Sequence, residues 1–304
     1  MQSDRPVQFE TISCPVCGSK EYHKERDVRD RFDTIPGQIY TIVRCNQCQL
    51  LYLNPRPDST SLGVFYSAEG YDPFVSSRDN ANLLTGLYRF VRRFTIRRKA
   101  ARVSGGLKQN ALCLDIGCAT GEFLVELHRR GFEVRGVEPD PRSAEFSRTT
   151  HGLQVWTGTI HDVPDDAGPF DLITLWHVLE HVPDLQQNLS RLYSLLKPGG
   201  RLAIAVPNPC SGDARHYQAN WVAWDTPRHL YHFEPPVMLK LLEQSGFEAR
   251  RAGAVAFDAF YHSLLSESGG IVRFGRAGWQ GFLSFIRGIC GGEGSSELYI
   301  AHKR

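Results

Sequence analysis

The 304-residue chain has 41% hydrophobic and 22% charged residues, which is the composition of a globular protein. Its formal net charge is +2, so no global charge favours binding to nucleic acid or to an anionic membrane. Its length suits one large domain with an appendage, or two domains. No apolar run reaches the roughly 18 residues of a transmembrane helix, and the polar N-terminus lacks the apolar core of a signal peptide. We therefore expect a cytoplasmic protein.

Two pairs of cysteines lie near the start of the chain. Cys14 and Cys17 form one Cys-x-x-Cys unit, Cys45 and Cys48 form a second, and 27 residues separate the units. Four thiolates at this spacing are typical of a structural zinc site, while a metal-free knuckle or a redox pair is the alternative. We predict that all four bind Zn²⁺ and that residues 1–57 form a zinc-ribbon-like module.

A basic amphipathic segment follows this module. Apolar residues recur at helical spacing between Leu83 and Phe94, and the other face carries arginines as far as Arg102. We expect residues 58–109 to be a helical linker or cap. Its basic face is predicted to be a solvated surface, and contact with an anionic membrane is the alternative.

Short apolar runs alternate with helical patterns from residue 110 onwards. This pattern predicts a Rossmann-like, mostly parallel seven-stranded sheet with helices on both faces, in which the C-terminal ends of the strands share one ligand-binding edge. Residues 258–292 interrupt the alternation and are expected to be an insert in a core of residues 110–304. Strands are predicted at 111–116, 133–137, 154–157, 172–176, 201–206, 252–257 and 297–302, and helices are predicted to begin near Glu122, Ser143, Leu185 and Pro235.

The first predicted strand of the core runs into a turn of small residues. Asp115 lies at the end of the strand, and Gly117, Ala119 and Gly121 allow a ligand to approach the backbone closely. The amide groups at the start of the following helix are free to donate to that ligand. Glu138 ends the next strand, 23 residues after Asp115, where an acid is suited to hold the two ribose hydroxyls of a nucleoside or, alternatively, to cap a loop.

The segment 114–121, LDIGCATG, resembles motif I (D-x-G-x-G-x-G) of class I S-adenosylmethionine-dependent methyltransferases, with Ala119 at the middle glycine. Residues 170–175 (FDLITL) and 195–202 (LLKPGGRL) resemble the family's fourth strand and the turn before its fifth. These segments make the chain similar to methyltransferase-23 and ubiquinone-methyltransferase-like proteins over about half its length. Bacterial methyltransferases that resemble enzymes of sugars and surface saccharides carry a similar N-terminal zinc module.

The resemblance implies S-adenosylmethionine as the cofactor and a set of contacts to it. Thr159 and Ile160 would flank the adenine, and Trp176 and His177 would lie near the sulfonium, whose positive charge an aromatic face favours. The remaining cofactor contacts would come from Asp115, Gly117, Ala119, Gly121 and Glu138.

Histidines follow the strands that are predicted to end at the ligand edge. A hydroxyl acceptor needs a base, so we predict that His181 or His229 deprotonates it. Structural packing is the alternative. Glu180, His181 and the distant His229 also resemble the E-x-x-E-H…His motif that holds a divalent metal in 3-demethylubiquinone-type and small-RNA 3′-end methyltransferases, with His177 in place of the first acid.

The predicted function is transfer of a methyl group from S-adenosylmethionine to an oxygen of a small-molecule or saccharide acceptor. A lipid-linked acceptor and a peripheral membrane location are compatible with the basic segment and the aromatic insert. An RNA methyltransferase that uses the zinc ribbon as a binding surface is one alternative, which the near-neutral charge disfavours. A non-catalytic protein that retains the S-adenosylmethionine fold is the other.

Overall fold

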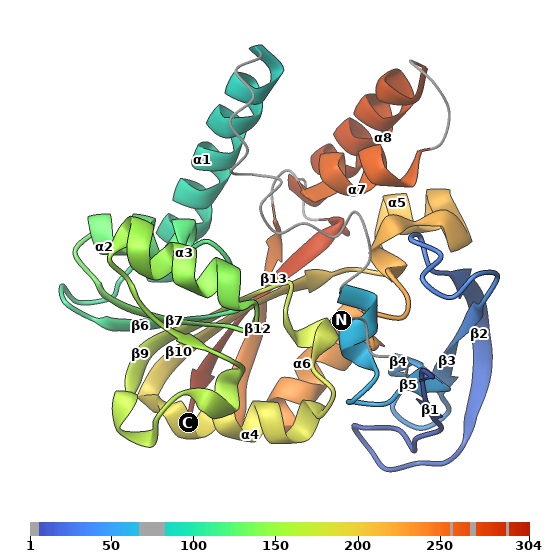
Figure 1. Ribbon diagram of the computed structural model, residues 1–304, viewed down its shortest axis with the longest axis horizontal. Coiled ribbons are helices and arrows are strands. Elements are labelled where there is room, and N and C mark those ends of the chain that lie inside the picture. The colour runs from blue at the N-terminus through green and yellow to red at the C-terminus, as the bar shows by residue number, and fades with distance from the viewer. Residues whose placement is uncertain (1–5, 67–82, 256–257, 268–271, 290–291) are drawn as a thin grey trace.

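A seven-stranded sheet lies at the centre of the computed structural model, which describes residues 6–66, 83–255, 258–267, 272–289 and 292–304 (Figure 1). Its strand order is β12-β13-β10-β9-β6-β7-β8. The pairings from β10 to β8 are all parallel, and β13 runs antiparallel between β10 and β12. The strands are β6 (Leu112–Ile116), β7 (Glu133–Glu138), β8 (Gln154–Thr157), β9 (Phe170–Trp176), β10 (Leu196–Pro207), β12 (Phe247–Ala254) and β13 (Ser296–Lys303).

Helices cover both faces of this sheet, as the alternating pattern predicts. In Figure 1, α2 and α3 lie over one face and α4 and α6 over the other. Asp140 and Asp184 cap α3 and α4 by accepting hydrogen bonds from amide groups of the first turn, which fixes where these helices begin. The helices are α1 (Leu83–Ser104), α2 (Glu122–Arg129), α3 (Pro141–His151), α4 (Leu185–Leu195), α5 (Gly212–Tyr217), α6 (Pro235–Gln244), α7 (Asp258–Ser266) and α8 (Val272–Ile289), with 3₁₀ turns η1 (Leu62–Tyr66), η2 (Ile160–Asp162), η3 (Asp165–Ala167), η4 (Leu179–His181), η5 (Gln218–Asn220) and η6 (Val222–Trp224).

Two strands of the core differ from their predicted positions. The strand predicted at 201–206 begins earlier, because Leu196 already pairs with Phe170 before an irregularity that contains the LKPGG sequence shifts the register. The strand predicted at 252–257 was wrong in position: β12 covers Phe247–Ala254, and residues 256–257 lie outside the described residues. β12 is an edge strand with the sequence FEARRAGA, so its charged residues concealed it from a search for apolar runs.

The N-terminal part of the chain forms most of a second, four-stranded sheet in the order β11-β4-β3-β2, and Cys45 is the one of the four cysteines that lies in a strand of it. Its first three strands in the chain are β2 (Tyr22–Arg29), β3 (Ile39–Cys45) and β4 (Leu51–Leu53), and a separate pair joins β1 (Phe9–Glu10) to β5 (Arg56–Pro57). The edge strand β11 (Tyr231–His232) comes from the region between β10 and α6. The N-terminal sheet therefore incorporates a piece of the methyltransferase-like region, and Tyr40 and Leu53 share one apolar core with Leu230 and Phe233.

A buried arginine links the two parts of the chain. The guanidinium of Arg228, which is 0% exposed, donates to Asp30 of the N-terminal part at 2.6 Å and to Asp225 at 2.8 Å. Although burial alone would raise the pKa of Asp225, nearby cationic groups, Arg228 among them, hold this pKa at about 2. Asp30 is likewise kept ionised, since its pKa is lowered. The segment that carries His229 is thus held by a charge network in the interior.

Two helical elements project from the same side of the molecule (Figure 1). One is α1, and the other is the pair α7–α8, which occupies most of the expected insert at 258–292. Part of the expected helical cap at 58–109, residues 67–82, lies outside the described residues. Within the described ranges, no helix combines the length and the apolar character needed to cross a membrane.

Candidate active site

The turn after β6 places small residues where a side chain would not fit. Gly117 and Gly121 have φ of 68° and 80°, in the left-handed region that favours glycine. A Cβ atom at Gly117 would lie 2.7 Å from Cγ2 of Val178, and one at Gly121 would lie 2.7 Å from Cδ1 of Leu153. Ala119 also has a positive φ, 47°, so it takes the middle-glycine position with the backbone conformation that a glycine would adopt more easily.

Two carboxylates flank this turn. Glu138 accepts hydrogen bonds from the amides of Ala119 (2.8 Å) and Asp140 (3.0 Å), and burial raises its pKa. Since a carboxylate has about four acceptor positions, Glu138 both holds the turn and keeps capacity for further donors. Burial raises the pKa of Asp115 to about 7, although the Thr174 hydroxyl donates to this carboxyl group at 2.5 Å.

The other predicted cofactor residues lie at the C-terminal ends of β8 and β9, on the same edge as the turn. Thr159 caps the 3₁₀ turn η2 after β8, and Ile160 is buried within that turn. The Trp176 ring packs edge-on against Phe123 at 5.3 Å, and the ammonium of Lys99 lies 4.7 Å from the centre of this ring. Sequence reasoning missed Lys99, because nothing in the basic run of α1 distinguished this residue from its neighbours.

His177 follows β9 in a left-handed conformation with φ of 57°. Its Nε2 atom donates to Asp258 at the start of α7 (2.9 Å), and its Nδ1 atom lies 3.4 Å from the Glu180 carboxylate. Although burial alone would lower it, these two carboxylates raise the pKa of His177 to about 9. His177 is therefore an imidazolium at neutral pH. Asp258, 81 residues later in the chain, was also missed by sequence reasoning, since no local motif marks it.

Glu180, His181 and His229 come together beyond the end of β9. Each offers a ligand atom, and these atoms lie within 4.8 Å of one another. Nδ1 of His181 lies 2.9 Å from the Tyr66 hydroxyl and 3.1 Å from the carbonyl oxygen of Arg228, and Nδ1 of His229 lies 2.8 Å from the carbonyl oxygen of Ala223. When each Nδ1–H donates to its carbonyl, each Nε2 keeps a lone pair for a ligand.

The buried polar groups of this cluster do not all have partners within the described part of the chain. Burial and the neighbouring His181 lower the pKa of His229 to about 4, so its ring is neutral at pH 7. Glu180 is 1% exposed; its Oε1 atom faces the His177 imidazolium at 3.4 Å, and its Oε2 atom has no hydrogen-bond partner within the described part of the chain. A buried carboxylate oxygen without a donor is costly. The cluster thus fits a group that donates protons or carries positive charge, such as a hydroxyl or a divalent cation.

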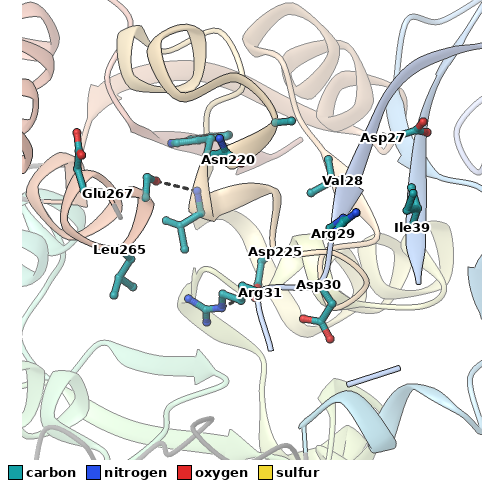
Figure 2. A pocket seen from close by; sticks show the side chains of 14 residues that line it. Asp27, Val28, Arg29, Asp30, Arg31, Ile39, Asn220, Asp225, Leu265 and Glu267 are labelled. Carbon is teal, nitrogen blue, oxygen red and sulfur yellow. Dashed lines mark hydrogen bonds and ion pairs between the residues drawn. The ribbon is translucent and has the colours of Figure 1, made fainter. Parts of the chain in front are cut away.

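A pocket of about 530 Å³ lies between the N-terminal sheet, the segment 219–225 and α7, and none of Glu180, His181 and His229 is among its lining residues (Figure 2). This volume is within the range of small-molecule sites. Trp221 and Asp225 contribute to its wall, and Ala223 between them accepts the hydrogen bond from His229. The labelled side chains of Figure 2 that carry charge are Asp27, Arg29, Asp30, Arg31, Asp225 and Glu267.

The four predicted zinc ligands also lie together. Sγ of Cys14 is 3.3 Å from that of Cys48, Sγ of Cys17 is 3.5 Å from that of Cys45, and all four sulfur atoms lie within 4.8 Å of one another. Tetrahedral Zn²⁺ with Zn–S bonds of about 2.3 Å places its sulfur atoms about 3.8 Å apart. The arrangement therefore fits Zn²⁺ after shifts of a few tenths of an ångström.

Comparisons with known proteins agree with this geometry. A ubiquinone biosynthesis O-methyltransferase of Xanthomonas axonopodis pv. citri is 27% identical over 49% of this chain and 67% of its own length. One of Alkalilimnicola ehrlichii is 31% identical over 36% of this chain and 46% of its own length. The chain thus spans between about half and two thirds of the length of these curated relatives.

Solved structures show the same fold. Magnesium protoporphyrin IX methyltransferase from Synechocystis PCC 6803 with bound SAH aligns with a TM-score of 0.52 at 16% identity, over 81% of this chain and all of that one. The methyltransferase complexed with the Trm112 activator of Haloferax volcanii aligns with a TM-score of 0.53 at 14% identity, over 72% of this chain and 94% of that one. A family model described as Methyltransferase domain matches residues 87–252, more than half of the chain. The chain belongs to this family and is an S-adenosylmethionine-dependent methyltransferase.

Proposed function

We propose that this enzyme methylates an oxygen atom of a small-molecule or saccharide acceptor, with His181 and His229 at the reacting hydroxyl. The cluster of Glu180, His181 and His229 carries the proposal, because it brings two imidazole rings and a buried carboxylate together beside the cofactor edge. The names of the curated relatives support oxygen as the methylated atom.

The cofactor contacts in this proposal follow the edge of the sheet. Gly117, Ala119 and Gly121 would accommodate the methionine and ribose parts, and Glu138 would accept from the ribose hydroxyls beside its two backbone donors. Thr159 and Ile160 would flank the adenine. Asp115, Trp176 and His177 would line the methionine end, where the Lys99 ammonium is placed to meet the methionine carboxylate.

The acceptor hydroxyl must lose its proton as its oxygen attacks the methyl carbon. A neutral imidazole within hydrogen-bond reach can take that proton. Because the pKa of His229 is only about 4, His229 is suited to orient the hydroxyl, and we assign proton removal to His181. The same three side chains could hold a divalent cation, which would supply a lowered pKa for a bound hydroxyl.

Transfer of labelled methyl groups from S-adenosylmethionine tests this function. We expect transfer to small hydroxyl compounds, either catechols or nucleotide sugars, and no transfer to RNA. Transfer to RNA would contradict the proposal in favour of the RNA alternative. Binding of S-adenosylmethionine in calorimetry, without methyl transfer to any of these hydroxyl compounds or to RNA, would instead favour a non-catalytic binding protein.

We also propose that residues 1–57 form a structural zinc module, residues 58–109 a linker or cap, and residues 110–304 the methyltransferase core. A site of four thiolates has no open position for substrate, so its role would be to stabilise the fold. The position of the cysteine cluster at the end of β3, in the four-stranded sheet that β11 joins, supports this role, since Cys45 is the last residue of β3.

Removal of the metal should therefore destabilise the enzyme. We expect one zinc ion per chain by elemental analysis. Cys45→Ser should lose this ion and lower Tm by on the order of 10 °C, since structural zinc contributes several kcal/mol to folding. Cys210→Ser, a change at a partly buried cysteine outside the cluster, is the matched control and should keep both the zinc and the Tm. If wild-type protein without zinc had the same Tm as zinc-loaded wild type, the proposal of a structural zinc module would be refuted.

A further inference from the structure

The two projecting helices differ in charge from the rest of the chain. The sequence of α1 contains seven basic residues and no acid, and that of α8 contains three basic residues and no acid. Since the formal net charge of the whole chain is only +2, the remainder of the protein is net acidic. Positive charge is thus concentrated on the two elements that extend furthest from the sheet (Figure 1).

α8 presents an apolar stripe to solvent. Trp279, Phe282 and Ile286, at helical spacing, are 64%, 45% and 41% exposed. The orientation of the helix is fixed from its other face, where the buried hydroxyl of Ser284 donates to the buried carboxylate of Asp213 at 2.9 Å. Monomeric proteins rarely expose such a contiguous aromatic stripe without a partner for it.

Exposed arginines accompany apolar side chains on both helices. On α8, the helical repeat places Arg276 and Arg287 along one edge of the stripe, and both are exposed. On α1, Arg93 and Arg97 are exposed, and so is the ring of Phe94, at 43%. Aromatic side chains beside arginines are typical of helices that lie in the interface of an anionic membrane.

Both projecting elements, α1 and the α7–α8 pair, also contact the cofactor edge, at the neighbouring residues Trp176 and His177. Lys99 of α1 lies over the ring of Trp176, and Asp258, the first residue of α7, accepts the hydrogen bond from His177. A bilayer in contact with these helices would therefore lie close to the end of β9, where an acceptor carried by a lipid could approach the enzyme.

We propose that the outer faces of α1 and α8 form a surface that binds an anionic phospholipid bilayer. We name it the two-helix surface and define it by Arg93, Phe94, Arg97, Trp279 and Phe282, with Arg276, Ile286 and Arg287 beside them. The aromatic rings enter the interfacial region, and the arginines meet the phosphate groups of the lipids. A second copy of the chain is the other candidate occupant of this surface, and the test separates the two.

Co-sedimentation of the full-length protein with vesicles tests this surface, in the absence of S-adenosylmethionine and acceptor so that the result does not depend on the proposed reaction. Wild type should bind phosphatidylcholine vesicles that contain phosphatidylglycerol, bind pure phosphatidylcholine vesicles weakly, and lose affinity as salt is added. Arg93→Gln combined with Arg97→Gln should reduce the affinity by about five-fold per arginine. Trp279→Ser combined with Phe282→Ser should reduce it by at least about ten-fold.

Matched controls carry the same changes elsewhere on the exposed surface. Arg129→Gln on α2 and Tyr22→Ser on β2 should bind as the wild type does. Wild type that fails to bind anionic vesicles at low salt would overturn the proposal, as would equal losses in variants and controls. Dissociation of an oligomer by the Trp279 and Phe282 changes, without vesicle binding by wild type, would assign the surface to a second copy instead. If the circular dichroism spectrum of the double serine variant differs from that of wild type, the vesicle binding of the double arginine variant decides whether the proposal holds.

Discussion

Replacement of both His181 and His229 by glutamine is expected to reduce kcat by on the order of 10²–10⁴-fold, the usual contribution of a positioned acid–base group. The affinity for S-adenosylmethionine should stay within about threefold of wild type, because neither residue lies at the turn between β6 and α2. The rate of labelled methyl transfer to a hydroxyl compound that the wild type methylates measures kcat. Calorimetry with S-adenosylmethionine alone measures the affinity for this cofactor.

The exposed His216 on α5 provides the control, and His216→Gln should leave both quantities unchanged. Unchanged turnover in the double variant would rule out a role for the histidines in catalysis. A chelator distinguishes between the two chemistries that the cluster allows. Loss of turnover in wild type on treatment with a chelator that leaves the zinc content and the Tm unchanged, restored by one divalent metal, would assign Glu180, His181 and His229 to metal binding rather than to proton removal.

Arg228→Met should lower the free energy of unfolding by about 3–5 kcal/mol, the usual cost of removing one partner of a buried ion pair. Methionine fills much of the same volume, so the loss would come mainly from the carboxylates of Asp30 and Asp225, which would stay buried without their guanidinium. Urea unfolding followed by circular dichroism measures this difference.

Arg31→Met is the matched control, because Arg31 contacts the same Asp225 at 3.0 Å but keeps 32% of its side chain exposed. Its loss should cost less than about 1 kcal/mol, since solvent screens the partly exposed guanidinium of Arg31 and Asp225 keeps its contact with Arg228. Asp30→Asn in the Arg228→Met background should recover part of the stability, because it removes one of the uncompensated charges. Equal effects of Arg228→Met and Arg31→Met would contradict the assignment of Arg228 as the buried link.

The sequence predicts the core sheet well because its inner strands are buried on both faces and therefore read as continuous apolar runs, as in Leu172–Leu175 of β9. β2 was not predicted because its sequence, YHKERDVR, is largely charged and exposed, and its pairing with β3 provides the strand. β11 has only two residues, and nothing local marks it as a strand. Such elements depend on partners distant in the chain, which a local pattern does not contain.

The residues of the candidate site fall into the same two groups: those that the local sequence predicts and those that depend on partners distant in the chain. Asp115, the glycine turn and Glu138 follow consecutive strands, so their shared edge follows from topology alone. The partners of His177 and Trp176 come instead from α7 and α1, and no spacing rule connects Asp258 or Lys99 to them. Sequence analysis predicted the zinc knuckles from their repeated Cys-x-x-Cys spacing, and the four sulfur atoms do lie together, whereas the metal itself is still a proposal.

The position of β11 at the edge of the N-terminal sheet has a consequence for synthesis on the ribosome. β4 ends at Leu53 and pairs with β3 along one edge, but its partner along the other edge, β11, begins only at Tyr231. At about 5–20 residues per second, the roughly 180 intervening residues take about 10–35 s to translate. During that time the β4 edge of the nascent chain has no native partner, and an open edge of this kind is a site for wrong pairing between chains. Slower elongation before residue 231 should therefore lower the yield of native enzyme more than slower elongation after it.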